Sequence, residues 1–252
     1  MLLLALVACR PEPAPAELEE LCGWIYAHFA EERERDLVAG VENLDAWMLE
    51  HALEIDEDGY EVLQLSDEVP DSLPGEREHA VEGAVGAAVA DPITHGVLPV
   101  ATALVVEDQV EVFEGVYERY ERVFEGDPDC FMDLECEQVG AENDFDSQYG
   151  GLIEVSTLMH AQYRWVQLED GPALIQRTWL SGETEVSVDW ASVDEQYFLM
   201  VALPRPDGAL RVQTVWIKAR LGEDSAPESA ALNVMVNSMR SQTEQLQAWL
   251  DR

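Results

Sequence analysis

Two stretches in the second half of the chain bring together side chains that could bind a ligand. Both have the aromatic, alternating composition of strands, and they lie at residues 159–165 and 176–179. Alternation puts Tyr163 and Trp165 on one face of the first strand, and Arg177 and Trp179 on one face of the second. If these faces coincide, they form an aromatic wall that carries a guanidinium group, which suits an apolar ligand with an acidic group. The alternative is an ordinary sheet core in which the arginines stack on aromatic rings or pair with carboxylates.

Signatures of catalysis and of metal binding are missing from the sequence. It contains no GxSxG, HExxH or glycine-rich phosphate loop. The five histidines and four cysteines do not follow the spacing of zinc ligands. The acidic segment 54–59 matches the start of a calcium loop loosely, but Leu65 stands where the bidentate glutamate belongs. We therefore expect no catalytic residue, no metal and no cofactor, and we do not expect an enzyme.

The cysteines beyond the N-terminal region fall into two kinds. Cys130 and Cys136 enclose five residues, a spacing that can close a disulfide across a short loop. Cys22 lies at helical spacing with Leu21 and Ile25, where a free cysteine behaves as a small apolar side chain. We predict a Cys130–Cys136 disulfide and a buried, free Cys22.

The chain opens with a short apolar run that ends at Cys9. A bilayer-spanning helix needs about 20 residues, so this run is typical of the end of a secretory signal sequence. Its last four residues, Leu6-Val7-Ala8-Cys9, resemble the lipobox of bacterial lipoproteins. The resemblance implies that residues 1–8 are the end of a signal peptide, that cleavage precedes Cys9, and that acyl chains such as palmitate are attached to Cys9.

The segment after Cys9 fits such an anchor. Residues 9–15 are rich in proline, as expected of an extended tether between a lipid and a folded body. Arg10 replaces the aspartate that marks inner-membrane retention among these lipoproteins, so the resemblance implies the outer membrane, facing the periplasm or the cell surface. Two or three acyl chains anchor a protein stably, whereas one is marginal. We expect a cell-envelope protein that contacts the membrane through its lipid.

The charge of the chain excludes several classes of partner. It has 52 acidic and 14 basic residues, which gives a net charge of −38. A chain this acidic repels the phosphate backbone, because nucleic-acid binding needs clustered lysine and arginine. The same charge disfavours adhesion to anionic lipid headgroups. An apolar content of 47% nevertheless supports a folded core rather than disorder.

Hydrophobic periodicity predicts two regions. Residues 16–31 and 34–55 repeat apolar side chains at helical spacing, which predicts a helical hairpin. A proline- and glycine-containing loop at 69–75 ends this part. We therefore predict an N-terminal helical extension at 16–75 and a second domain at 76–252.

The second domain has the patterns of a sheet followed by one long helix. Most of 100–113 is predicted to be helical, and a helix is predicted at 227–250 with a capping box at Ser225 and Glu228 and one apolar stripe. An antiparallel sheet exposes an apolar face that such a helix can cover. The predicted strands are 80–90, 116–124, 131–145, 151–168, 173–180, 196–203 and 209–221.

This order of elements resembles the START-like superfamily, also called the SRPBCC or helix-grip fold. The resemblance implies an α+β fold in which a curved antiparallel sheet grips the C-terminal helix, here preceded by the N-terminal hairpin. It further implies an apolar small molecule held between sheet and helix. The alternative is a structural or accessory envelope lipoprotein with a solid core that acts through a protein partner. The candidate ligand-binding residues are Tyr163, Trp165, Arg177, Trp179, Trp216, Met235 and Met239.

Overall fold

The computed structural model describes residues 13–30, 34–51, 55, 59–62, 65–66, 68–75, 77–149, 153–221 and 228–252. The predicted lipobox and Cys9 lie outside these residues. The helices are α1 (Leu18–Ala27), η1 (His28–Ala30, a 3-10 helix), α2 (Glu34–His51), α3 (Glu68–Asp71), α4 (Val97–Val105), α5 (Gln109–Val112), α6 (Pro128–Met132) and α7 (Glu228–Leu250). The strands are β1 (Tyr60–Val62), β2 (Val85–Ile93), β3 (Tyr117–Glu125), β4 (Gln138–Tyr149), β5 (Ile153–Leu168), β6 (Gly171–Leu180), β7 (Glu185–Val186), β8 (Ala191–Arg205) and β9 (Gly208–Leu221).

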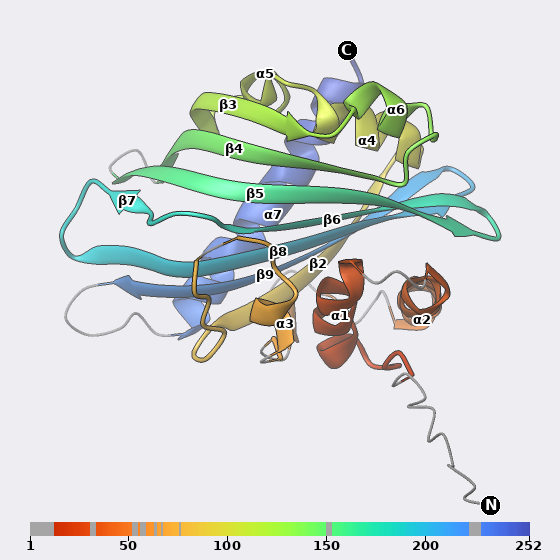
Figure 1. The fold of residues 1–252 in the computed structure, drawn as a ribbon, viewed down its shortest axis with the longest axis horizontal. Coiled ribbons are helices and arrows are strands. Elements are labelled where there is room, and N and C mark those ends of the chain that lie inside the picture. Colours follow the sequence, from red (N-terminus) through yellow and green to blue (C-terminus); the bar gives the residue numbers. More distant parts are fainter. Residues whose placement is uncertain are drawn as a thin grey trace, which may run out of the picture.

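All the strands belong to one antiparallel sheet. Its order is β1-β2-β9-β8-β6-β5-β4-β3, and the short β7 pairs with β5 beyond the end of β6. Two-residue turns join β5 to β6 and β8 to β9, whereas α6 lies between β3 and β4, and β2 pairs with the distant β9. The prediction of an α+β fold with a curved antiparallel sheet and a long C-terminal helix is confirmed (Figure 1).

Helices cover the sheet on both faces. We call the side that packs against α4, α5, α6 and α7 the α7 face, and the side that packs against α1 and α2 the α1 face (Figure 1). On β5, Trp165 packs in the cluster of the α7 face, while the next residue, Val166, packs in that of the α1 face. A sheet buried on both sides reads as a nearly continuous apolar run, which is the pattern of β5, β6 and β8.

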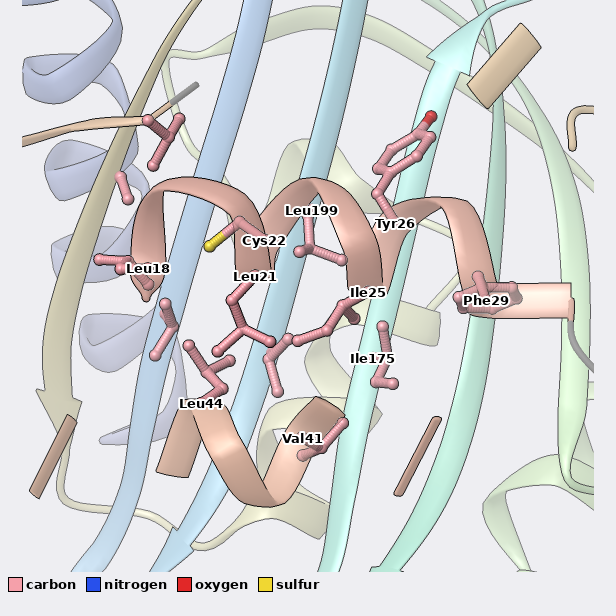
Figure 2. Close-up of a cluster of buried hydrophobic side chains, with 14 of the residues drawn as sticks. Leu18, Leu21, Cys22, Ile25, Tyr26, Phe29, Val41, Leu44, Ile175 and Leu199 are labelled. Atoms are coloured by element: carbon pink, nitrogen blue, oxygen red, sulfur yellow. The ribbon is translucent and has the colours of Figure 1, made fainter. Parts of the chain in front are cut away.

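The α1 face is a tightly packed apolar layer. α1 places Leu21 and Ile25 on the sheet, against strand residues such as Ile175 and Leu199, as Figure 2 shows. All four side chains are almost fully buried. Burial of one such side chain contributes about 1.5–3 kcal/mol, so this layer fixes the N-terminal hairpin on the sheet.

The C-terminal helix lies on the opposite side of the sheet with the orientation that its pattern predicts. Val236, Met239 and Leu246 are buried, while Asn237 and Glu244 are exposed. Its contacts with the sheet are concentrated on β2 and β9, and α4 and α5 contact it further along. The helix therefore covers one side of the sheet obliquely and does not lie along the central strands.

The predicted elements differ from the structure in a few places. The strand predicted at 131–145 begins only at Gln138, because residues 128–132 form α6. Asp127 caps α6 by accepting from two backbone amides of its first turn, a signal that favours a helix. The strand β7 was not predicted. β1 pairs with β2, so the predicted extension 16–75 contributes a strand to the sheet, and the boundary at residue 75 stays a prediction.

The predicted pairing of cysteines is confirmed. Cys130 and Cys136 form a disulfide with a Cα–Cα distance of 5.3 Å, which ties α6 to the start of β4. Cys22 is free and buried among the apolar side chains of α1. Burial raises the pKa of the Cys22 thiol to about 12, so it stays protonated and behaves as an apolar group.

One glycine allows the closest approach in the α1 layer. Gly86 on β2 lies directly opposite Trp216 on β9, and a Cβ at position 86 would lie 2.6 Å from Trp216 Nε1 and 2.8 Å from Val62 Cγ2. We expect Gly86→Ala to lower the free energy of unfolding by about 1–3 kcal/mol, because a packed core tolerates an added methyl poorly. Urea denaturation measures the change. Gly96→Ala is the control, because its added Cβ meets nothing within 4 Å and only the N-cap preference of α4 is affected. Equal midpoints for both variants would contradict the packing described.

Candidate functional site

The register between β5 and β6 decides how the candidate residues are grouped. Tyr163 lies opposite Gln176, and Trp165 lies opposite Leu174. Residues that face each other across two strands share a face of the sheet. Arg177 is therefore directed to the other side, opposite Gln162. The predicted single aromatic wall that carries the Arg177 guanidinium is wrong, because Tyr163 and Trp165 are on the α7 face while Arg177 and Trp179 are on the α1 face.

The seven candidates consequently divide into two sets. Four of them lie between the sheet and the helices of the α7 face: Tyr163, Trp165, Met235 and Met239. Three lie beneath the N-terminal hairpin: Arg177, Trp179 and Trp216. A site between sheet and C-terminal helix can use only the first set. The ligand-binding role of each residue stays a prediction.

Tyr163 and Trp165 hold short helices against the sheet. Trp165 Nε1 donates to the Phe131 carbonyl of α6 at 2.8 Å, and the two rings stack with centroids 5.2 Å apart. The Tyr163 hydroxyl donates to the Leu104 carbonyl near the end of α4 at 3.3 Å. Arg122 on β3 adds bonds to the Leu104 and Val106 carbonyls at 2.8 and 2.9 Å. These side chains satisfy the last carbonyl groups of α4 and fix its position.

On the α1 face, Arg177 likewise donates to main-chain carbonyls and holds helices against the sheet. Its Nη1 donates to the Tyr26 carbonyl at 3.1 Å and its Nη2 donates to the Ser72 carbonyl at 3.2 Å, so it ties α1 and the end of α3 to β6. The guanidinium also lies over the rings of Phe29 and Trp179, at 4.7 and 5.4 Å from their centroids. Burial lowers the pKa of Arg177 to about 10, so it remains charged at neutral pH. This arginine corresponds to the predicted alternative of arginines stacked on aromatic rings in a sheet core.

The centre of the α7 face is less closed than the centre of the α1 face. Gln176 on β6, Met200 on β8 and Gln213 on β9 lie side by side in one row across the sheet, and Phe198 lies in the next row. Gln176 and Phe198 are only partly buried although they lie on central strands beneath the helices, whereas Tyr197 and Leu199 on the other side of β8 are at most 2% exposed. The α7 face therefore leaves part of Gln176 and Phe198 accessible, whereas Met200 and Gln213 beside them are buried.

Polar side chains gather on the same face, where β2, β9 and α7 meet. Arg211 Nη1 donates to Thr243 Oγ1 of α7 at 3.0 Å, and Gln213 Nε2 donates to the same oxygen at 2.9 Å. Thr243 Oγ1 lies 3.3 Å from Asp91 Oδ2 of β2, a carboxyl whose pKa is raised, chiefly by burial. Arg211, Gln213 and Thr243 are at most 5% exposed. A polar group of this size inside an apolar layer joins β2, β9 and α7.

Aromatic side chains line the same face on the β3–β4 side. The Tyr117 ring lies 5.0 Å from that of Tyr120 and 5.1 Å from that of Phe145, and the last two stack at 5.5 Å. The α7 face therefore carries aromatic rings on β3 and β4 and packs against α7 at β2 and β9.

Sequence reasoning missed the polar members of this region. Arg211 and Gln213 alternate with the apolar Val212 in a predicted strand, a pattern that normally indicates a solvent-facing side. The available signal is that two helical regions have to cover this strand. The long C-terminal helix covers one face, and, as the structure shows, the N-terminal hairpin covers the other. With both faces covered, an arginine and a glutamine in mid-strand must be buried.

The known structures that resemble this chain do so at low sequence identity. No known protein family and no curated protein matches the sequence. A STAR-related lipid transfer protein from Xanthomonas axonopodis is 14% identical, with a TM-score of 0.43, over 69% of this chain and 91% of that chain. A START superfamily protein from Mycobacterium smegmatis is 9% identical, with a TM-score of 0.46, over 67% and 98%. The similarity concerns the fold, so the function has to be argued from the residues of this chain.

None of the helices that the structure describes combines the length and hydropathy needed to cross a membrane.

The contacts of Arg177 predict a purely structural effect of its removal. Arg177→Met should lower the free energy of unfolding by about 1–3 kcal/mol for each carbonyl left without a donor, here those of Tyr26 and Ser72. Urea denaturation at pH 7 measures this loss. The control is Arg220→Met, which removes the same charge from a side chain that is 71% exposed and should change stability by less than about 0.5 kcal/mol. Equal effects of the two substitutions would show that Arg177 does not hold the hairpin.

Proposed function

We propose that this protein binds an apolar small molecule between the sheet and α7. The observation that carries the proposal is the partial exposure of Gln176 and Phe198 on central strands beneath the helices of the α7 face. A packed interior would bury both, as the α1 face buries Tyr197 and Leu199. An apolar space with a few convergent polar groups is the usual form of a small-molecule site.

The side chains around this space suit a ligand of variable shape. Met200 on β8 and Met235 and Met239 on α7 surround Phe198 on the sheet–helix side. Methionine is unbranched and polarisable, so it fills irregular gaps and adapts to different neighbours. The N-terminal hairpin fills the opposite face, so the α7 face is the side of the sheet left for a ligand.

We further propose that the protein is held in the cell envelope by lipid on Cys9, at the outer membrane. The support is the lipobox resemblance at residues 6–9 and the proline-rich segment that follows it. Asn43 on α2 donates to the carbonyls of Ala14 and Pro15, so the chain is attached to the body from residue 14 onward. A tether from Cys9 to Ala14 reaches at most about 20 Å, which would keep the binding domain next to the bilayer.

Two substitutions on α7 distinguish a ligand-lined interior from a solid one. Leu246 packs with α4 and is fully buried, so Leu246→Ala should cost about 2–5 kcal/mol of unfolding free energy. Met239→Ala should cost about half of that or less, because the space beside it is already present, but it should reduce the amount of ligand retained. Urea denaturation measures the first quantity, and native mass spectrometry of gently purified protein measures the second.

The outcome also decides between the proposed function and its alternative. A bound apolar molecule in the wild type that is reduced in Met239→Ala supports binding. Equal destabilisation by both substitutions, together with an unliganded wild type, would indicate a solid core. The protein would then be an accessory lipoprotein that acts through a protein partner.

The anchor has its own test. In cells that express the chain with a complete signal sequence, a clickable fatty acid should label the wild type and should not label Cys9→Ser. Cys22→Ser is the matched control, since Cys22 is buried and free and should leave the label unchanged. Labelling of Cys9→Ser at the wild-type level would exclude this anchor.

A further inference from the structure

Four arginines are buried in the sheet, and three of them share one kind of partner. Arg122, Arg164 and Arg177 each donate to main-chain carbonyls at the ends of helices or turns: those of Leu104 and Val106, of Phe29, and of Tyr26 and Ser72. Such carbonyls are orphan acceptors, so these guanidinium groups have an evident structural purpose. The fourth arginine, Arg211, donates to no main-chain carbonyl of the described residues.

Arg211 is also poorly satisfied. It is 1% exposed, and its single hydrogen bond within the part of the chain that the structure describes runs from Nη1 to Thr243 Oγ1. Its Nε is buried without an acceptor, and no carboxylate of the described residues lies within 4.0 Å of its nitrogens. Asp91 is the neighbouring acid, opposite Arg211 in the register and linked to it through Thr243. A guanidinium group has five donors in a planar fork, so most of this capacity is unused.

The neighbouring amides have unused capacity as well. Gln213 donates to the Met239 carbonyl and to Thr243, while its Oε1 is buried without a partner. Gln176 Oε1 is likewise buried without a partner among the described residues. Gln176 lies two strands away from Gln213 in the same row, a separation of about 10 Å. Unpaired amide oxygens of the described residues therefore lie on either side of Met200, in the row next to Phe198.

We propose that Arg211 is the headgroup site for a long-chain carboxylic acid, whose alkyl chain extends over Phe198 and Met200 against Met235. This assignment rests on the proposed function and names the class of its ligand. A carboxylate matches the planar fork of a guanidinium and accepts two parallel hydrogen bonds. Burial lowers the pKa of Arg211 to about 10, which leaves it charged at neutral pH.

The acidity of the protein affects how an anionic ligand can be selected. With a net charge of −38, the surface repels an anion, so a carboxylate gains nothing from the surroundings of the site. Selection of an acid over a neutral molecule of equal length therefore requires a local cation inside. Arg211 is a buried cation on this face whose Nε has no acceptor among the described residues. A bound carboxylate would accept from the donors of Arg211 that Thr243 leaves unused.

The test compares three probes of equal length on the full chain: palmitic acid, hexadecanol and methyl palmitate. The dissociation constant of each is measured by displacement of a fluorescent apolar dye. Wild-type protein should bind palmitic acid at least tenfold more tightly than hexadecanol or the ester. Arg211→Met should weaken palmitic acid at least tenfold and leave hexadecanol within about twofold. Arg220→Met is the control for loss of one positive charge and should leave all three constants unchanged.

The outcomes separate this assignment from the proposed function. If wild-type protein binds the acid, alcohol and ester equally, the carboxylate assignment is overturned while the proposed function stands. If neither the dye nor any probe binds, both fall. Should Arg211→Met not fold, the comparison of the three probes on wild type, repeated with Arg211→Lys, decides the matter. The lysine variant keeps the charge but loses the fork, so its preference for the acid should be intermediate.

Discussion

The structure depends on one constraint, which is that a long antiparallel sheet is covered by helices on both faces. Strands such as β5 and β6 bury side chains in both directions, and helices that end against the sheet present carbonyl groups that water does not reach. Buried arginines satisfy these groups. Arg122 holds the end of α4, and Arg177 holds α1 and the turn at Ser72. A guanidinium suits this purpose because its donors spread in one plane and reach several acceptors at once.

This use of arginine is notable in a chain that has 52 acidic residues and 14 basic ones. Simple pairing would place every cation at the surface beside a carboxylate, as Arg119 does with Asp144 and Asp146. Exposed pairs contribute little to stability, whereas a buried donor that satisfies a buried carbonyl avoids a cost of about 1–3 kcal/mol. Some of the few basic residues of this chain are thus buried in the interior. Arg211 is buried at the same cost without a carbonyl to satisfy, which is why its position bears on function.

Hydrophobic periodicity predicted the long helices and strands, because each depends on a repeat of 2 or 3.6 residues that is local to its own segment. It missed short elements such as α3, α6 and β7. It could not predict which side chains of neighbouring strands share a face of the sheet. Tyr163 and Trp165 share a face because they are two residues apart, and so do Arg177 and Trp179, but only the register between β5 and β6 relates one pair to the other. The N-terminal hairpin was predicted as an extension. Because it packs on the sheet, Arg177, Trp179 and Trp216 contact the hairpin and do not face the C-terminal helix. Short-range signals therefore locate the strands, whereas long-range pairing decides which side chains can meet.

The two faces of the sheet also differ in what their helices can fill. On the α1 face, α1 and η1 lie across the strands and bury large side chains against them, from Leu21 of α1 to Phe29 of η1 (Figure 2). On the α7 face, α7 contacts mainly β2 and β9, while the short helix α4 contacts β6 and β8. Phe198 and Gln176 are only partly buried between these helices. The same hairpin that buries Arg177, Trp179 and Trp216 thus covers the opposite face of the sheet with packed side chains, so a site on this sheet has to use the α7 face.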